Sequence, residues 1–313
     1  MTRAFLFPGQ GSQKIGMGLV LADTFAPARR VFEEVDDALS QKLSRLMWEG
    51  PDGDLTLTEN AQPAIMAASL AVIAVLKHEA GLDIAKHACM VAGHSLGEYS
   101  ALAAAGAFTL ADAARLLRAR GQAMQSAVPV GEGAMTALIG AEIQTAEAVA
   151  QEAAQGQVCV IANDNAPGQV VLSGNKSAID RATEIAKTKG VKRAILLSVS
   201  APFHCVLMQP AADAMQVALS KVTIRPPAVP LLANVTAQQT SEPETIRNWL
   251  VQQVTARVRW RESMLALRSA GVSTTVEFGG EKVLTGMVKR TDKELQTFTL
   301  DTPADIEAFA KVL

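Results

Sequence analysis

The chain alternates short apolar runs with longer segments in which apolar residues recur every three or four positions. The short runs predict strands, and the periodic segments predict helices. Residues 62–81 predict a buried helix, with Pro63 in its first turn and Gly81 at its C-terminal end. A strand over 87–95 and a helix over 96–108 follow. Strands that feed helices in this way are typical of a layered α/β protein.

From about residue 134 the pattern changes to strand, helix, two strands joined by a turn, helix and strand. This βαββαβ order is typical of a ferredoxin-like arrangement. We therefore expect an α/β-hydrolase-like large domain, discontinuous over residues 1–130 and 201–313, with a ferredoxin-like small domain inserted at 131–200.

Two helix starts have recognisable capping residues. Ser177 and Asp180 have the spacing of a capping pair for the second helix of the inserted segment. Thr302 and Pro303 suit the N-cap and first-turn positions of the last helix.

The composition is ordinary for a globular protein with a sizeable core, with 49% hydrophobic and 19% charged residues and a net charge of −2. No Lys/Arg run provides the basic face that nucleic-acid binding requires. The longest apolar run, 64–76, is shorter than the roughly 20 residues of a membrane helix. We expect a cytoplasmic protein with neither nucleic acid nor membrane as a partner.

The three cysteines lack the paired spacing of a zinc or redox site, so no metal is expected. Cys89 and Cys159 lie in apolar runs and are expected to be buried. Cys205 directly follows His204 and is a secondary candidate for reactivity.

A glycine-rich loop follows the first predicted strand. It has Lys14 where a dinucleotide fingerprint requires glycine, and it lacks the Gly-Lys-Ser/Thr of a phosphate-binding loop. Nucleotide binding is therefore not predicted, although the glycines allow backbone N–H groups to approach a ligand.

The segment Gly93-His94-Ser95-Leu96-Gly97 matches the G-x-S-x-G nucleophile elbow, between a predicted strand and a predicted helix. Such a turn exposes the serine, and the N–H that follows it points where an oxyanion would form. The alternative is a glycine-bounded turn whose serine only caps the helix.

The chain has four histidines, so the proton acceptor can be sought by elimination. His78 and His87 are expected to be solvated, and His94 should point away from its neighbour Ser95. His204 remains, downstream of the serine as in elbow enzymes.

No acidic residue stands out as a third member of a triad. Asp164 belongs to the predicted inserted domain, and a backbone carbonyl can also orient a histidine. A Ser–His dyad is therefore adequate chemistry.

Arg120 lies on the apolar stripe of the predicted helix over 110–128, whereas Arg115 and Arg118 lie off it and are expected to be solvated. A guanidinium on a core-facing stripe requires an anion, and its fork of donors suits a carboxylate. That anion is either a bound ligand or an internal Asp or Glu.

Six motifs occur in order along nearly the whole chain: FPGQGSQ, GHSLGEYSAL, RGQAMQ, NAPGQVVLSG, SAPFH and KVLTGM. Together they closely resemble the malonyl-CoA:acyl-carrier-protein transacylase family of bacterial fatty-acid synthesis, with relatives in polyketide synthases. The resemblance implies an α/β-hydrolase-like large domain with an inserted ferredoxin-like one.

By the matching motifs, the resemblance implies Ser95 as the nucleophile, His204 as the base and Arg120 as the partner of the malonyl carboxylate. It also implies an oxyanion hole formed by the backbone N–H groups of Gln10 and Leu96.

Two further residues are implied by the same resemblance. The main-chain carbonyl of Gln253 would orient the histidine, although the sequence of the segment around it departs from the one usual in the family. Phe203 resembles the malonyl-selective form of its motif, which favours malonyl over methylmalonyl.

The resemblance thus implies malonyl transfer from malonyl-CoA to acyl carrier protein through a malonyl-serine ester, with ping-pong kinetics and without metal or bound cofactor. Three alternatives share these features. One is a malonyltransferase of a malonate decarboxylase or polyketide pathway, the second is a serine thioesterase or esterase, and the third is a non-catalytic carrier-protein-binding subunit.

Overall fold

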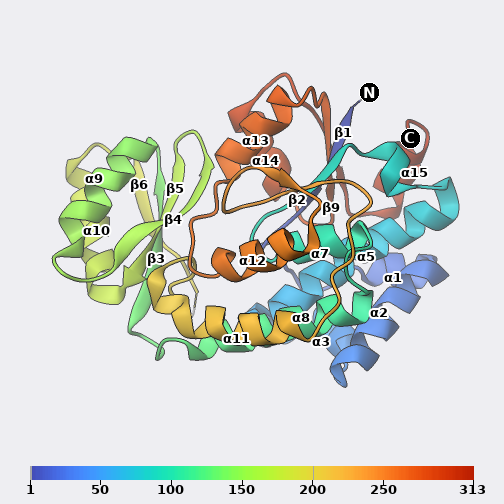
Figure 1. The fold of residues 1–313 in the computed structure, drawn as a ribbon, viewed down its shortest axis with the longest axis horizontal. Helices are drawn as coiled ribbons and strands as arrows, with labels where there is room; N and C mark the ends of the chain where they lie inside the picture. Colours follow the sequence, from blue (N-terminus) through green and yellow to red (C-terminus); the bar gives the residue numbers. More distant parts are fainter. Residues whose placement is uncertain (1, 200) are drawn as a thin grey trace.

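The computed structural model describes residues 2–199 and 201–313, which form two sheets, each with its own helices (Figure 1). The strands are β1 (Arg3–Phe7), β2 (Met90–Gly93), β3 (Gly133–Ile139), β4 (Cys159–Ala166), β5 (Gln169–Asn175), β6 (Arg193–Leu196), β7 (Leu231–Leu232), β8 (Gln239–Thr240), β9 (Thr274–Phe278) and β10 (Gln296–Leu300). The helices are α1 (Leu19–Thr24), α2 (Ala26–Leu39), α3 (Leu43–Glu49), α4 (Asp52–Thr56), α5 (Thr58–Ala80), α6 (Ile84–His87), α7 (Gly97–Ala104), α8 (Leu110–Ser126), α9 (Ile143–Ala154), α10 (Lys176–Thr188), α11 (Gln209–Ser220), α12 (Pro243–Gln253), α13 (Trp260–Ser269), α14 (Val283–Thr291) and α15 (Pro303–Ala310), with a 3-10 helix at Val206–Met208.

The larger sheet has the strand order β10-β9-β1-β2-β7-β8, and its neighbours are parallel except for the antiparallel pair β7–β8. Side chains of β1 alternate between its two faces, as the two-residue period of a strand requires. Phe5 and Phe7 join the core formed with α2, α5, α7 and α8, whereas Ala4 and Leu6 join the core formed with α13 and α14. The sheet is thus buried on both faces, as parallel sheets usually are.

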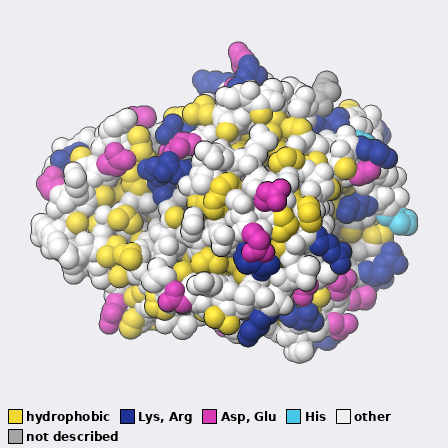
Figure 2. Space-filling view, viewed as in Figure 1, with side chains coloured by type: hydrophobic (Ala, Val, Ile, Leu, Met, Phe, Trp, Pro, Cys, Tyr) yellow, Lys and Arg dark blue, Asp and Glu magenta, His cyan; other side chains and the backbone are white. Residues whose placement is uncertain are grey.

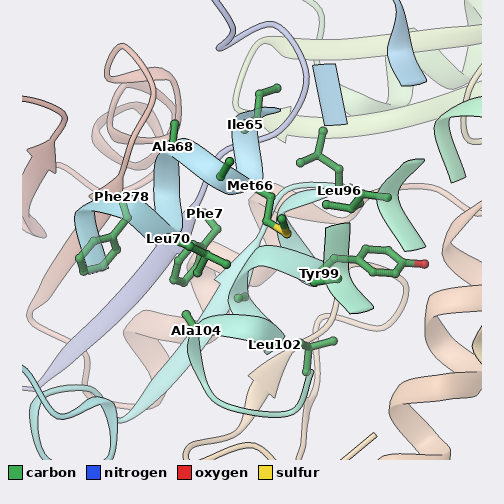
Figure 3. Close-up of a cluster of buried hydrophobic side chains, with 14 of the residues drawn as sticks. Phe7, Ile65, Met66, Ala68, Leu70, Leu96, Tyr99, Leu102, Ala104 and Phe278 are labelled. Carbon is green, nitrogen blue, oxygen red and sulfur yellow. The ribbon is translucent and has the colours of Figure 1, made fainter. Parts of the chain in front are cut away.

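The close-up in Figure 3 shows the first of these cores, where side chains of α5 and α7 gather with Phe7 of β1 and Phe278 of β9. Phe7 stacks on Phe278 of β9 at 5.5 Å between ring centroids. Met66 and Leu70 of α5 pack in the same cluster, which holds the start of α7 against the sheet.

The smaller sheet is antiparallel, with the strand order β4-β5-β3-β6. It lies with α9 and α10 at the left of Figure 1, and these two helices close a separate core with one face of the sheet. The predicted α/β class is confirmed as a parallel sheet with a separate antiparallel one.

The end of β4 connects the smaller sheet to the segment before α13. Asn163 forms a parallel bridge with Val258, and the Val258 N–H donates to the carbonyl of Ala162 at 2.8 Å. Arg261 of α13 donates to both carboxylate oxygens of the buried Asp164. A bidentate ion pair with a buried carboxylate fixes the relative position of its two partners. It therefore holds this end of β4 against α13.

Helix α5 is longer than the sequence pattern predicts. It begins at Thr58, so Pro63 lies beyond the first turn, and it ends at Gly81 in the left-handed conformation, as expected. Within the described residues it is the one helix whose length and composition would let it cross a membrane, but 89% of its apolar window is buried in the protein. A core helix of a globular protein passes the same test.

The two capping predictions have different outcomes. Thr302 caps α15 in a complete capping box with Asp305. The prediction for Ser177 and Asp180 is wrong, because the N-cap of α10 is Asn175, two residues before Ser177. Ser177 instead donates to Gln157.

On the face drawn in Figure 2, basic and acidic side chains are interspersed and form no continuous region of one sign. The charges on this face therefore offer no extended basic surface.

Candidate active site

Ser95 lies in the sharp turn between β2 and α7, with a positive φ of 53° that non-glycine residues seldom adopt. The flanking glycines are required by sterics. A Cβ on Gly93 would lie 1.9 Å from the carbonyl carbon of Gly97, and one on Gly97 would lie 2.2 Å from the Phe7 oxygen. The G-x-S-x-G spacing thus lets the turn pack directly against the end of β1.

Asn234, which follows β7 and is fully buried, holds the turn from the other side. Its Oδ1 accepts from the Ser95 N–H at 2.7 Å, and its Nδ2 donates to the Gly93 carbonyl at 2.8 Å. These two bonds satisfy backbone groups that the turn would otherwise leave unpaired. Residues with strained backbone persist when their surroundings fix them in this way.

His204 and Ser95 are in hydrogen-bond contact, with 2.8 Å between Nε2 and Oγ. The Nδ1 of His204 lies 2.9 Å from the Gln253 carbonyl, which can only accept, so Nδ1 carries the proton and Nε2 is free to accept one. Burial, assisted by the positive charge of Arg120, lowers the pKa of His204 to about 3. The imidazole is therefore neutral at pH 7.

The other histidines lie elsewhere. His78 is exposed, and His87 is half-buried with its Nδ1 at 2.9 Å from the Asp83 carbonyl. His94 points to the Asn165 Oδ1, 2.8 Å from its Nε2, and not to Ser95, as the alternation predicts.

Asp164 does not contact His204, because its carboxylate is occupied by Arg261. Cys205 is buried, its Sγ lies 3.1 Å from the Pro202 carbonyl, and burial raises the pKa of the thiol. A raised thiol pKa disfavours the reactive thiolate, so nothing supports Cys205 as a nucleophile. Cys159 is buried as expected, whereas Cys89 is only partly buried.

Arg120 of α8 is 1% exposed, and its guanidinium is bound by neutral acceptors. Nη1 donates to Gln62 Oε1 at 2.8 Å, and Nη2 donates to Gln253 Oε1 at 2.9 Å and to Ser95 Oγ at 3.0 Å. Within the part of the chain that the structure describes, no carboxylate lies within 4.0 Å of it, and its Nε has no hydrogen-bond partner. Among the described residues, Arg120 therefore has no ion pair with an internal Asp or Glu, which was the structural alternative to a bound ligand.

Arg118, on the same helix, differs from expectation. It is half-buried and not solvated, because its guanidinium binds Asn60 and Gln41. Arg115 is exposed as predicted.

The glycine-rich loop approaches the same site. Thr58 donates to the Gln10 side chain at 2.8 Å and accepts from Gln62 Nε2 at 2.9 Å, so loop, α5 and Arg120 form one hydrogen-bonded chain. Gln10 and Leu96 both line the pocket beside Ser95. Their backbone N–H groups belong to the two segments from which an oxyanion hole would be formed.

These groups line a cavity of about 330 Å³ between the two sheets. Its polar end holds the serine, the histidine and the guanidinium. Its apolar walls come from the smaller sheet, the loop before the 3-10 helix and α14, with Met135, Val171, Phe203 and Met287 among them. The cavity suits a small acyl group with a polar tail, carried by a longer chain that extends to the opening.

Three residues that hold the site together were not predicted from the sequence: Gln62, Glu98 and Asn234. All three are nearly or fully buried polar side chains inside apolar segments. A polar residue in an otherwise apolar run was the available signal, because such groups are buried only when hydrogen-bonded. In the described part of the chain, no group of three or more His, Cys, Asp or Glu side chains could hold a metal ion.

A serine in contact with a neutral histidine at a strand-to-helix elbow, beside a buried guanidinium, is typical of enzymes that carry an acyl group on serine. Comparison with known proteins points to the same class of enzyme. The family model for the acyl transferase domain matches residues 4–306. The malonyl CoA-acyl carrier protein transacylase of Bacillus subtilis (strain 168) is 44% identical over 99% of this chain and 96% of its own length.

The corresponding protein of Escherichia coli (strain K12) is 43% identical over 97% of each chain. Among solved structures, an acyl-carrier-protein-S-malonyltransferase from Bartonella henselae is 56% identical, with a TM-score of 0.98 over 100% of this chain and 99% of that one. A malonyl-transacylase in complex with a type II polyketide-synthase acyl-carrier protein is 39% identical, with a TM-score of 0.96 over 100% of both chains. The chain therefore belongs to the malonyl-CoA:acyl-carrier-protein transacylase family.

Proposed function

We propose that this chain transfers a malonyl group from malonyl-CoA to the phosphopantetheine thiol of acyl carrier protein, as a step of type II fatty-acid synthesis. The observation that carries the proposal is the buried Arg120 guanidinium, 3.0 Å from Ser95 Oγ and bound by neutral acceptors. An acyl group on Ser95 that ends in a carboxylate would place an anion where this cation needs one.

In the first half-reaction, His204 Nε2 takes the Ser95 hydroxyl proton as Oγ attacks the thioester carbonyl of malonyl-CoA. The backbone N–H groups of Gln10 and Leu96 stabilise the oxyanion. When the intermediate collapses, the C–S bond breaks and the CoA sulfur receives the proton from His204. A malonyl-serine ester remains.

The second half-reaction reverses these steps with a different thiol. His204 takes the proton of the carrier protein's phosphopantetheine thiol, whose sulfur attacks the ester carbonyl. The C–O bond breaks, and Ser95 regains the proton from His204. The Gln253 carbonyl keeps the imidazole in the tautomer that both halves require.

Selectivity resides in two residues. Without a substrate carboxylate the Arg120 charge stays buried and uncompensated, which penalises acetyl groups. Phe203 lies in the wall of the cavity, where its ring would limit the room beside the malonyl α-carbon and so favour malonyl over methylmalonyl.

We further propose that the larger part of the chain, 1–130 with 201–313, is an α/β-hydrolase-like domain and that 131–200 is an inserted ferredoxin-like domain. The β4-β5-β3-β6 order of the antiparallel sheet supports the second assignment. The proposed reaction uses the chain's own groups and the two thiols, so it requires no resident metal or cofactor. Its substrates belong to a cytoplasmic pathway, and we propose that location for this protein.

The acceptor is supported by the relative whose structure contains a polyketide-synthase carrier protein. Because that relative is 39% identical, a polyketide carrier protein is the second candidate acceptor for this chain. Transfer assays with carrier proteins of both pathways, run side by side, distinguish the two.

The test of the proposal is transfer of radiolabelled malonyl from CoA to acyl carrier protein, with intact-mass detection of the enzyme adduct. We expect the adduct on the wild type and its loss in Ser95→Ala. Release of free malonate at a rate that carrier protein does not change would indicate a thioesterase, and an adduct that survives Ser95→Ala would overturn the assignment of Ser95. A chain that binds carrier protein but never acquires the adduct would be a non-catalytic subunit.

A further inference from the structure

A buried chain of three side chains runs from Glu98 through Gln253 to Arg120. Gln253 Nε2 donates to the Glu98 carboxylate, and Gln253 Oε1 accepts from Arg120 Nη2 at 2.9 Å. We propose that Gln253 is a neutral spacer that keeps the Glu98 carboxylate from pairing with Arg120, and thereby leaves the guanidinium free for the substrate's carboxylate. This inference rests on the proposed function and adds Glu98 and the Gln253 side chain to its specificity-determining residues.

The orientation of the Gln253 amide is fixed by its neighbours. Arg120 can only donate, so it must face the amide oxygen. The Ser95 carbonyl, 3.0 Å from Nε2, can only accept, and so it must face the amide nitrogen. The amide therefore presents its oxygen to the guanidinium and both of its N–H groups to acceptors.

Glu98 is held in place at its other oxygen. It is 1% exposed, and its Oε1 accepts from the backbone N–H of Asn234 at 2.5 Å. Both carboxyl oxygens thus face N–H donors, an arrangement that the ionised form satisfies fully. Burial raises the pKa of Glu98 to about 8, even though the donors from Asn234 and Gln253 and the charge of Arg120 oppose that rise.

The spacer has an electrostatic consequence. Glu98 acts favourably on the Arg120 charge from a distance, which moderates the cost of burying that charge. A direct ion pair would compensate the guanidinium completely, and a substrate carboxylate would then have to displace an internal one. With the Gln253 amide between Glu98 and Arg120, the site tolerates a guanidinium that has no bound anion and still favours an incoming one.

Gln253 has two separable contacts, which makes the inference testable. Its backbone carbonyl orients His204, whereas only its side chain reaches Arg120 and Glu98. Side-chain variants at this position therefore leave the histidine's partner in place.

The experiment exchanges the carboxylate and the amide in the double variant Glu98→Gln/Gln253→Glu. Net charge is unchanged, but the carboxylate now lies against Arg120. The variant also loses the bond to the Ser95 carbonyl. Gln253→Met is the matched control, because it loses that bond without adding a carboxylate.

Acylation of Ser95 by malonyl-CoA and by acetyl-CoA is followed by rapid-quench mass spectrometry, without carrier protein. We expect kcat/KM for malonyl-CoA to fall at least about 100-fold in the exchanged variant, as for a site whose buried cation is already paired. The malonyl-to-acetyl ratio should fall well below that of Gln253→Met. Circular dichroism and thermal melting verify folding, and Gln253→Glu alone serves in its place should the double variant not fold.

An exchanged variant with the same malonyl-to-acetyl ratio as Gln253→Met would overturn the spacer role, as would equal losses of malonyl and acetyl acylation. These outcomes are separate from failure of the proposed function. A wild type that acquires the malonyl adduct but does not pass it to carrier protein refutes the transfer and leaves the spacer comparison intact. A wild type that never acquires the adduct refutes both.

Discussion

Nη2 of Arg120 in α8 lies 3.0 Å from Oγ of Ser95, although Ser95 lies 25 positions earlier, in the turn before α7. The group that would hold the far end of the substrate therefore already touches the atom that would attack its near end. A malonyl unit is short enough to span from the serine to the guanidinium. In the proposed reaction, selection of the acyl group and its attack would therefore depend on this one pair of side chains.

Replacing Arg120 should remove selectivity more than it removes chemistry. In Arg120→Met, which keeps most of the side-chain volume, we expect kcat/KM for malonyl-CoA to fall at least about 100-fold, since leaving one member of a buried charge pair without its partner costs about 3–5 kcal/mol. Acetyl-CoA should be affected little. Steady-state kinetics with both thioesters measure the ratio, and Arg118→Met, on the same helix, is the control that should keep it. An unchanged ratio in Arg120→Met would return Arg120 to a structural role.

The sequence predicts the pairing of Ser95 with His204 because its signals are local or countable. The elbow is a contiguous motif with steric requirements, and a chain of four histidines leaves one in a suitable position. Arg120 is detectable because it interrupts an apolar stripe. Even so, Ser95 and His204 are 109 positions apart in the sequence, and only the fold brings Oγ and Nε2 to 2.8 Å.

The supporting residues could not be predicted in the same way. Glu98 is hydrogen-bonded to Asn234, 136 positions away, and to Gln253, 155 positions away. No local sequence pattern encodes pairings over such distances. The sheet edge is also weakly encoded, since β7 and β8 have two residues each. The predicted starts of α5 and α10 were too late in the sequence. Pro63 and Ser177 suit the beginning of a helix, but both lie inside helices that begin before them.

Asn234 should be necessary for the geometry of the elbow. Asn234→Ala leaves the Ser95 N–H and the Gly93 carbonyl without their buried partners, at about 1–3 kcal/mol each. We expect a loss of about 2–4 kcal/mol in the free energy of unfolding, with a fall in the rate of Ser95 acylation by malonyl-CoA in the molecules that remain folded. Urea titration and rapid-quench mass spectrometry measure the two.

Asn175→Ala is the comparison for this variant. Asn175 accepts from the Val158 N–H at 2.9 Å in the smaller sheet, remote from Ser95. Its loss should lower stability without slowing acylation. Equal acylation rates in the two variants would show that Asn234 does not position the serine.

Gly97 should tolerate no side chain. A Cβ at this position would lie 2.2 Å from the Phe7 oxygen and 2.9 Å from the Pro8 oxygen, both backbone atoms that cannot rotate away. Gly97→Ala should therefore destabilise the protein by about 1–3 kcal/mol, as overpacking does, and displace the elbow from β1. Gly286→Ala in α14 has no atom within 4 Å of the added carbon and should be neutral or stabilising by up to about 1 kcal/mol. Thermal unfolding of the two variants compares them directly, and a stable Gly97→Ala would contradict the steric account of the motif.

His204 should make the protein less stable in acid. Its pKa is lowered to about 3 in the folded protein and returns to about 6.5 in the unfolded chain. Between these values the unfolded chain binds a proton here that the folded protein does not. The free energy of unfolding therefore falls as the pH drops from about 6.5 toward 3, with this residue contributing up to about 1.4 kcal/mol per pH unit.

The measurement is urea unfolding from pH 7 down to pH 4 in the wild type and in His204→Asn, whose amide does not titrate. Stability of the variant should fall less steeply across this window, because the proton that favours the unfolded wild type has no site. Parallel stability curves for the wild type and His204→Asn would mean that protonation of the imidazole does not destabilise the folded protein. Such a result would contradict the lowered pKa of His204 and its explanation by burial.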